Sequence, residues 1–213
     1  MIYTVTMNPS LDYLLSLPAL QAGETNRSAA ERLVAGGKGI NVSKMLYNLG
    51  TDSIIWGFAG GFSGEELCRQ LTAAGLRQDL IFLHNGNTRI NVKLSAGQET
   101  EVNAAGPKAE EEALQIFYRR LEALTAEDYV VLSGSLLPGM PCNSYRQIMQ
   151  QLQGRGVHFI VDTTGESLRE TLPLHPFLIK PNQRELEELF KTELTPVSYT
   201  HLRAQETDSY LVC

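Results

Sequence analysis

The sequence predicts an α/β fold in which a mostly parallel sheet is flanked by helices. Short apolar runs that fit strands alternate with segments whose apolar residues recur at helical spacing, through most of the 213 residues. The runs predicted as strands span 2–7, 53–58, 129–132, 157–161 and 177–179. Because these runs are continuously apolar, we expect both faces of the sheet to be covered by helices.

Helices are predicted between these strands. Apolar residues at helical spacing indicate helices near 41–49, 63–74, 114–124, 148–152 and 186–190. The second of these has the strongest boundary signals. Ser63-Gly-Glu-Glu66 has the spacing of a capping box, Phe62 and Leu67 are placed as a hydrophobic staple, and Gly75 is placed as a C-cap.

Two regions depart from this pattern and predict a small accessory sheet. Residues 12–17 and 28–34 resemble strands but are short and half polar. Residues 88–94 and 99–102 fit a hairpin closed by Ala96-Gly-Gln98. Side chains alternate along the first arm of this hairpin, so its charged and polar residues share one face.

Composition excludes several classes of function. The chain has 18 basic and 24 acidic residues and no basic run, so it is a poor binder of nucleic acid or of a membrane surface. The scattered three cysteines and four histidines indicate neither a disulfide framework nor a zinc site. The N-terminal segment does not fit a signal peptide, and no apolar run reaches membrane-spanning length. We therefore expect a cytoplasmic protein whose anionic ligands are held by a few placed cations.

A glycine-rich loop, Gly36-Gly-Lys-Gly-Ile-Asn-Val-Ser43, precedes the first predicted helix. Such a loop lets the backbone approach a ligand closely, and a helix N-terminus favours anions. A flexible loop that ends with Asn41 as the helix start is an equally good interpretation of the loop alone. The spacing is neither that of a phosphate-binding P-loop nor that of a dinucleotide-binding turn, which disfavours an oxidoreductase.

The spacing of this loop, followed by Gly50 and Gly60, resembles the N-terminal signature of the phosphofructokinase B branch of the ribokinase-like carbohydrate kinases. Further segments that resemble the family are 4–12, 133–139, 162–165 and 180–185. The resemblance covers residues 1 to about 195 nearly continuously. It implies an incomplete ribokinase-like kinase domain over 1–195, in which the strands near 12–17, 28–34 and 88–103 form a lid over a sugar. Gly36 and Gly37 would lie at the hinge of that lid.

Within this family the segment 88–94 is most similar to 1-phosphofructokinases. The resemblance then implies ATP- and Mg²⁺-dependent phosphorylation of fructose 1-phosphate to fructose 1,6-bisphosphate. A tagatose-6-phosphate kinase or a 6-phosphofructokinase of the same branch stays open as an alternative. So does a sugar-phosphate-binding module without catalysis.

The resemblance also implies which residues bind the sugar phosphate. They are Asp12, Gly36, Gly37, Lys38, Asn41, Arg89, Lys93 and Ser135. Arg89 and Lys93 share a strand face roughly 13 Å apart, so both could border one pocket, though not one phosphate oxygen. A guanidinium holds phosphate through two parallel hydrogen bonds, and an ammonium adds a point charge. Without the resemblance, an exposed polar hairpin face, a turn Asp12, an N-cap Asn41 and a loop Ser135 are the simpler interpretations.

For the nucleotide the resemblance implies Lys180, Asn182 and Glu185. Lys180 would lie near the ATP phosphates. Asn182 and Glu185 would hold Mg²⁺ through water, which suits an ion that keeps several waters and takes few protein oxygens. The alternative is structural, because Asn-x-x-Glu before an apolar helix is also a capping box.

The end of the sequence departs from the family. The resemblance places the general base in a late Gly-Ala-Gly-Asp motif, but no Gly-x-Gly-Asp follows Asn182, so no catalytic residue is assigned. From about Thr195 onward the similarity stops. We therefore expect residues 196–213 to be a non-native tail, the C-terminal part of the fold to be missing, and this chain to be inactive. The resemblance further implies a homodimer formed through the lid sheet.

Overall fold

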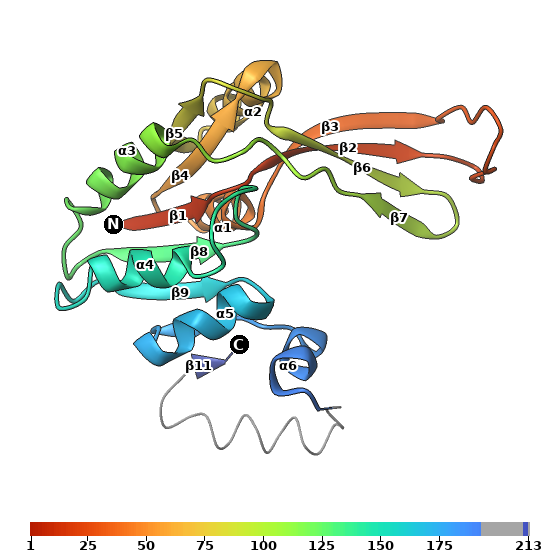
Figure 1. Cartoon of the computed structure of the whole chain (residues 1–213). Coiled ribbons are helices and arrows are strands. Elements are labelled where there is room, and N and C mark those ends of the chain that lie inside the picture. The colour runs from red at the N-terminus through yellow and green to blue at the C-terminus, as the bar shows by residue number, and fades with distance from the viewer. Residues whose placement is uncertain (193–210, 213) are drawn as a thin grey trace.

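The computed structural model describes residues 1–192 and 211–212. Its larger sheet has the strand order β11-β10-β9-β8-β1-β4-β5, and every neighbouring pair is parallel (Figure 1). These strands are β1 (Ile2–Thr6), β4 (Ser53–Gly60), β5 (Arg77–Leu83), β8 (Tyr129–Ser133), β9 (His158–Asp162), β10 (Leu178–Ile179) and β11 (Leu211–Val212). The predicted parallel sheet is confirmed.

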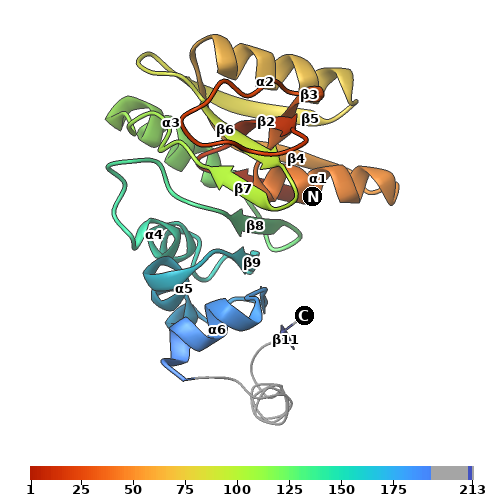
Figure 2. The same cartoon turned by 90° about the vertical axis from the view of Figure 1, so that its right-hand side faces the viewer.

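Helices cover both faces of this sheet. They are α1 (Lys38–Asn48), α2 (Gly61–Ala73), α3 (Glu111–Leu121), α4 (Ser144–Gln151), α5 (Gly165–Thr171) and α6 (Gln183–Phe190), with a short 3-10 turn η1 (Leu172–Leu174) after α5. Figure 2 shows α4 and α5 on one side of β8 and β9, and α1 on the opposite side. The helices on the two faces belong to two different apolar clusters, and the sheet lies between these clusters.

Strand β4 shows how the sheet separates the two apolar clusters. Its apolar side chains alternate between the two clusters, because successive side chains of a strand point to opposite faces. Ile55 packs with Leu67 and Leu71 of α2, whereas Trp56 and Phe58 pack with the cluster that contains α3 and α4. A strand buried on both faces reads as a continuous apolar run, as the sequence predicted.

The smaller sheet has the order β3-β2-β6-β7 and projects from the main body (Figure 1). Its strands are β2 (Ser10–Ser16), β3 (Ala30–Gly36), β6 (Arg89–Ser95) and β7 (Glu99–Val102). Strand β2 pairs antiparallel with β3 and parallel with β6, and β7 completes the hairpin with β6. Only residues 7–9 separate β1 from β2, so the chain steps directly from one sheet to the other there.

Two predicted helix starts are wrong. The first helix begins at Lys38 with Gly37 as its N-cap, so Asn41 lies inside the helix, and its N–H donates to the Gly37 carbonyl. The second begins at Gly61, directly after β4, because Gly61 has a φ of 58° and allows the sharp turn.

The predicted capping box and hydrophobic staple of the second helix are therefore also wrong. Ser63 lies within α2, and its hydroxyl donates to the Thr88 carbonyl at 2.6 Å instead of capping the helix. Phe62 is 66 % exposed and cannot be a staple. The C-terminal signal is confirmed, since Gly75 follows the helix with a φ of 73° and its N–H donates to Thr72.

Strand β5 and helix α5 were not predicted. Strand β5 begins with three polar residues, which precede and mask the short apolar run Leu80-Ile-Phe-Leu83. Helix α5 has seven residues and buries Leu168 and Thr171, too few for a helical period to be visible.

No helix in the described part of the chain has the length and apolarity that crossing a membrane requires.

Candidate functional site at the junction of the two sheets

The predicted site residues gather where the carboxyl ends of the parallel strands meet the smaller sheet. All strands of a parallel sheet end at the same edge, and ligands of open α/β folds bind outside that edge. Thr6, Ser133 and Asp162 are the last residues of β1, β8 and β9, and they lie in one register row. The N-terminus of α1 and the start of β2 adjoin this row, which brings distant parts of the sequence together.

Asp12 is the centre of the polar network on β2. Its Oδ1 accepts hydrogen bonds from Ser10 Oγ at 2.7 Å and from Asn91 Nδ2 at 2.9 Å, and its Oδ2 lies 3.1 Å from Lys93 Nζ. Partial burial pushes the pKa of Asp12 upward, but the hydrogen bonds from Ser10, Lys93 and Asn91 and the charge of Lys93 outweigh it. The pKa of Asp12 therefore lies below its ordinary value, and the carboxylate is ionised at neutral pH.

Lys93 is held by the same network. A hydrogen bond to Asp12 is the main cause that raises the pKa of Lys93, and the charges of Asp12 and Glu101 add to it. Its ammonium also lies 3.5 Å from Glu101 Oε1 on β7. The ammonium is thus charged and anchored between two strands of the smaller sheet.

Gly36 lies against this network, and Gly37 follows it at the start of α1. A Cβ atom at Gly36 would be 2.7 Å from Ser10 Oγ and 2.8 Å from Asp12 Cγ, so only glycine leaves room for the carboxylate. Gly37 has a φ of 132°, in the region that favours glycine, and it turns the chain from β3 into α1. The glycine loop therefore serves the close approach of β3 to Asp12 and the turn into the helix.

Arg89 and Lys93 lie on different cavities, contrary to the expectation of one shared pocket. Arg89 lines a cavity of about 520 Å³ together with Ser135 and Thr163. Lys93 lines another cavity, of about 590 Å³, on the smaller sheet with Leu14 and other residues of β2, β3 and β7. The physical reason is that the Lys93 ammonium is tied to Asp12 and Glu101 and not to the side of Arg89.

Arg89 is half-buried at the edge of its cavity. Its Nε donates to the Asn8 carbonyl at 3.2 Å, which fixes the guanidinium between the two sheets. Burial lowers the pKa of the Arg89 guanidinium, and the negative charge of Asp12 opposes that shift. A desolvated guanidinium with donors still available is suited to an anionic ligand.

Asn8 was not predicted as a site residue. Its Nδ2 donates to the carbonyls of Ala105 at 2.9 Å and Leu136 at 3.2 Å, so the side chain ties two loops that border the Arg89 cavity. Asn91, also unassigned in the sequence, accepts a hydrogen bond from the Ala104 N–H at 3.2 Å. The only sequence signals were the Asn-Pro-Ser that follows the first strand and the alternation along 88–94.

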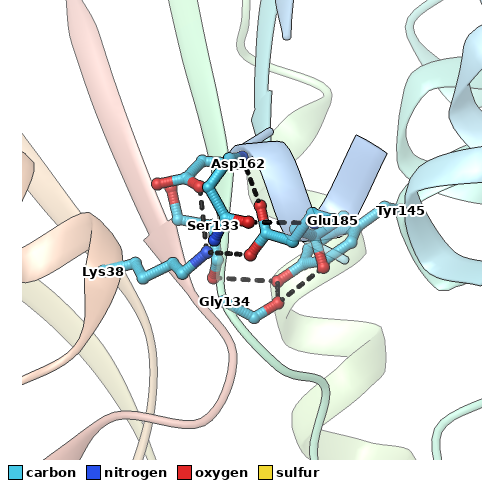
Figure 3. Close-up of polar contacts among 8 residues, drawn as sticks. Lys38, Ser133, Gly134, Tyr145, Asp162 and Glu185 are labelled. Carbon is cyan, nitrogen blue, oxygen red and sulfur yellow. Dashed lines mark hydrogen bonds and ion pairs between the residues drawn. The ribbon is translucent and has the colours of Figure 1, made fainter. Parts of the chain in front are cut away.

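Tyr145 of α4 fixes the loop that carries Ser135. The wholly buried Tyr145 hydroxyl donates to the carbonyls of Ser133 at 3.0 Å and Gly134 at 3.2 Å (Figure 3). Thr163 Oγ1 donates to the same Gly134 carbonyl at 3.0 Å. Burial raises the pKa of Tyr145, so the hydroxyl keeps its proton and remains a donor.

Lys38 lies between the sugar side and the nucleotide side of the predicted site. Figure 3 shows its side chain directed toward Asp162 and Glu185, and its Nζ is 3.0 Å from Asp162 Oδ1 and 3.7 Å from Glu185 Oε1. The resemblance grouped Lys38 with the sugar and Glu185 with the nucleotide. Asp162 was noted only as the end of a strand, although it is the nearest carboxylate to Lys38.

The start of α6 confirms the structural interpretation of Asn182 and Glu185. The Asn182 side chain accepts a hydrogen bond from the Glu185 N–H at 2.9 Å, and Glu185 Oε2 accepts one from the Asn182 N–H at 2.9 Å. This capping box leaves Glu185 Oε1 directed toward Lys38. Lys180 is exposed, and its backbone N–H donates to the Val161 carbonyl.

The donor set here fits a magnesium ion held through water. The carboxylates of Asp162 and Glu185 come from separate elements and converge on one positive charge, the Lys38 ammonium. Carboxylate oxygens are the ligands that Mg²⁺ prefers, and the ion commonly takes only one or two of them. No group of three or more His, Cys, Asp or Glu side chains that could hold an ion by themselves occurs among the described residues.

Asn41 is exposed on α1, and none of the described residues makes a hydrogen bond with its side chain. The predicted tail, 196–213, falls outside the described residues except for 211 and 212, so that prediction stays open.

A parallel sheet wrapped by helices, with a second sheet and a set of charged groups at its carboxyl edge, is the arrangement expected for a ribokinase-like carbohydrate kinase. A model of the pfkB carbohydrate kinase family matches residues 5–208. The chain belongs to the pfkB family of carbohydrate kinases.

Two curated relatives carry the name 1-phosphofructokinase. The one from Bacillus subtilis (strain 168) is 40 % identical over 197 residues, which are 92 % of this chain and 65 % of the relative. The one from Borreliella burgdorferi is 41 % identical over 194 residues, 91 % of this chain and 62 % of the relative. The chain thus spans less than two thirds of the length of both.

A solved structure supports the same fold. Phosphofructokinase-2 from Escherichia coli, crystallised with substrates and products, has a TM-score of 0.91 and 29 % sequence identity, over 99 % of this chain and 72 % of that one. The similarity covers both sheets, because nearly the whole chain is aligned.

Proposed function

We propose that this protein phosphorylates fructose 1-phosphate to fructose 1,6-bisphosphate, with ATP as the phosphoryl donor. Two relatives near 40 % identity that are named 1-phosphofructokinase support this substrate. The observation that carries the proposal is the ionised Asp12 network beside the half-buried Arg89 at the junction of the two sheets. Such a junction offers acceptors for sugar hydroxyls and donors for a phosphate within one region.

The predicted sugar residues other than Lys38 are assigned as follows. Arg89 and Ser135 line one cavity, and we assign the phosphate of the sugar to Arg89 there. Asp12 accepts hydrogen bonds from sugar hydroxyls, while Gly36 and Gly37 let the backbone approach the ring. Lys93 contributes positive charge to the phosphate side if closure of the smaller sheet brings it nearer. Asn41, exposed on α1, is assigned to the sugar through the family resemblance.

The nucleotide side is assigned to Lys180, Asn182 and Glu185, and Asp162 joins them. When bound, Mg²⁺ neutralises charge on the nucleotide phosphates. Asp162 and Glu185 would hold it through water, and Lys180 would supply positive charge to the phosphates. In phosphoryl transfer the protein acts mainly by placing the reactants in line and by stabilising negative charge. None of the described residues is assigned as the general base.

A 6-phosphorylated sugar is the second candidate substrate. A solved structure of the Escherichia coli phosphofructokinase-2 contains fructose-6-phosphate, and it has a TM-score of 0.90 and 29 % identity to this chain. Tagatose 6-phosphate belongs to the same class of ligand. The identity of the sugar then depends on which phosphate position Arg89 and Lys93 favour.

We also propose that two copies pair through their smaller sheets, in the cytoplasm. The cavity of about 590 Å³ on that sheet is bordered by Leu14, Leu15 and Leu94, so pairing would cover apolar surface. An inhibited form of the Escherichia coli phosphofructokinase-2 is described as tetrameric, which supports self-association within the family. Sedimentation equilibrium with and without sugar phosphate tests this.

Calorimetric titration of this chain with fructose 1-phosphate, fructose 6-phosphate and tagatose 6-phosphate tests the substrate. We expect fructose 1-phosphate to bind about tenfold more tightly than either 6-phosphate. We expect Arg89→Met to weaken all three ligands and Lys93→Met to weaken fructose 1-phosphate most.

Arg155→Met is the matched control, since it removes one positive charge from the turn after α4, where the Arg155 guanidinium donates to the Glu122 carbonyl. Preference for a 6-phosphate would favour the second candidate. If Arg89→Met binds all three sugars as tightly as the unmodified chain, the site itself is misplaced.

A further inference from the structure

Lys38 lies in an unfavourable place for a positive charge. It is the first residue of α1, and the N-terminus of a helix carries the positive end of the helix dipole, which repels cations. No acidic residue in the first turn of α1 offsets this repulsion. The charges that hold Lys38 instead come from β9 and α6, through Asp162 at 3.0 Å and Glu185 at 3.7 Å. The ammonium is therefore a bridge between elements far apart in sequence.

The exposures of these three side chains differ. The Lys38 side chain is 41 % exposed, whereas those of Asp162 and Glu185 are 10 % and 15 % exposed. The two carboxylates are fixed, because Asp162 ends a buried strand and Glu185 is locked into the capping box of α6. The lysine has a long flexible stem that reaches solvent. If one member of the trio moves, it is Lys38.

Two hydroxyls without partners also lie in the strand row that ends at Asp162. Ser133 is wholly buried and Thr6 is 2 % exposed, and neither hydroxyl oxygen has a hydrogen-bond partner among the described residues. Thr6, Ser133 and Asp162 lie in one register row, so their side chains project from the same face of the sheet. Buried hydroxyls normally have partners, and two in one row beside carboxylates are suited to a hydrated cation.

We propose that Lys38 is a built-in counter-ion that occupies the divalent-cation position between Asp162 and Glu185 and must leave before a metal can bind. The proposal rests on the proposed function only for the expectation that a metal–nucleotide complex uses this position. With Lys38 in place the trio has a net charge of −1, and without it the two carboxylates carry −2. Free Mg²⁺ must therefore push the Lys38 ammonium aside and is still repelled by it at short range, which weakens the binding of free Mg²⁺.

The displaced ammonium needs a new partner, and the nucleotide phosphates that accompany the metal provide one. The metal should therefore enter as its nucleotide complex rather than alone. Lys38 lies two residues after Gly36, whose backbone packs against Asp12. Movement of Lys38 should therefore also shift the glycine loop beside the sugar. Binding of the metal–nucleotide complex and binding of the sugar phosphate would then be energetically coupled.

Titration of this chain with Mn²⁺ alone, followed by the paramagnetic resonance signal of the free ion, tests the proposal without any catalytic activity. We expect Lys38→Met to bind one Mn²⁺ about tenfold more tightly than the unmodified chain, because a repelling charge is removed. Lys38→Arg keeps the charge and should bind Mn²⁺ as weakly as the unmodified chain. Adding Asp162→Asn to Lys38→Met should abolish the gain.

Arg146→Met is the matched control. Arg146 pairs with Glu170 at 2.9 Å between α4 and α5, so its loss removes the same charge from one carboxylate elsewhere. No gain in Lys38→Met, or an equal gain in Arg146→Met, would overturn the proposal. Lys38→Gln, which keeps a polar chain, repeats the test if the Met variant does not fold. These outcomes are independent of sugar binding, so a negative result leaves the kinase proposal standing.

Discussion

The two sheets of this molecule are built for different purposes. The larger sheet has apolar clusters on both faces, and its central strands are almost wholly buried. The smaller sheet has an exposed outer strand, β7, in which all four residues are exposed. Its buried residues lie near the junction, where a few apolar ones such as Leu11 adjoin the polar network around Asp12. The stability of the described fold thus comes mainly from one sheet and ligand recognition from the other.

The difference follows from where each sheet has neighbours. Helices on both faces remove the larger sheet from water, and burial of apolar area is the dominant favourable term in folding. The smaller sheet contacts helices only near the junction, mainly through α2. There Asp12, Asn91 and Lys93 meet, so its polar residues are fixed in place close to the main body. Mutations in the two sheets should therefore have separable effects on stability and binding.

The largest effect is expected from a core aromatic residue. Phe117 of α3 is 1 % exposed, and its ring centroid lies 5.7 Å from that of Phe58 and 6.3 Å from that of Trp56. Phe117→Ala should lower the free energy of unfolding by about 3–5 kcal/mol, because it leaves a cavity between α3 and the sheet. Urea unfolding measures this loss, and a change below about 1 kcal/mol would contradict the assigned core.

A matched pair of valines compares the two sheets directly. Val130 of β8 is wholly buried, whereas Val102 of β7 is 60 % exposed. The same change to alanine should cost about 2–3 kcal/mol at Val130. At Val102 it should cost less than about 0.5 kcal/mol. Equal losses in urea unfolding would show that the smaller sheet contributes to the stability of the fold as much as the larger one.

A smaller effect on stability, but a larger one on binding, is expected at Asp12. Asp12→Asn removes charge-assisted hydrogen bonds to a partly exposed network, which should cost about 1–2 kcal/mol. Because the pKa of Asp12 is lowered in the folded protein, its stabilising contribution is present above the pKa of an unfolded aspartate. That contribution is lost as the pH falls through the lower folded-state pKa.

Asp12→Asn should therefore flatten the acid side of the stability profile and weaken sugar-phosphate binding together. Urea midpoints measured between pH 3 and pH 7, with calorimetry at pH 7, follow both. If Asp12→Asn binds the sugar phosphate with full affinity, Asp12 is not part of the binding site. If the loss of stability at acid pH is unchanged in this variant, Asp12 is not a source of the pH dependence.

Much of the larger sheet could be predicted because its signal is local. Strands such as 129–132 are apolar throughout, and burial on both faces needs no partner to be known. Strand β5 was missed because its apolar run, 80–83, is short and follows the polar residues 77–79, which pair with β4 as part of the same strand. The capping box at Ser63 was a false local signal, overridden by the direct turn from β4 into α2 at Gly61.

The site could be predicted in its members but not in its pairings. Motif segments pointed to Lys38 and Glu185, but nothing in them indicated that these two side chains, distant in the sequence, would be in contact. Neither periodicity nor spacing carries such information. Alternation along 88–94 correctly placed Arg89, Asn91 and Lys93 on one face, but could not show that Lys93 would turn to Asp12 and leave Arg89 on another cavity.

The central claim is that the sugar phosphate binds where the two sheets meet, and hydrogen exchange with and without fructose 1-phosphate tests it most directly. We predict slower exchange of amides in 89–94 and 134–139. We predict no change around the separate cavity of about 520 Å³ at the amino end of β9, which Leu152, His158 and Phe177 line. Protection confined to that opposite cavity, or absent from both junction segments at saturating ligand, would contradict the account.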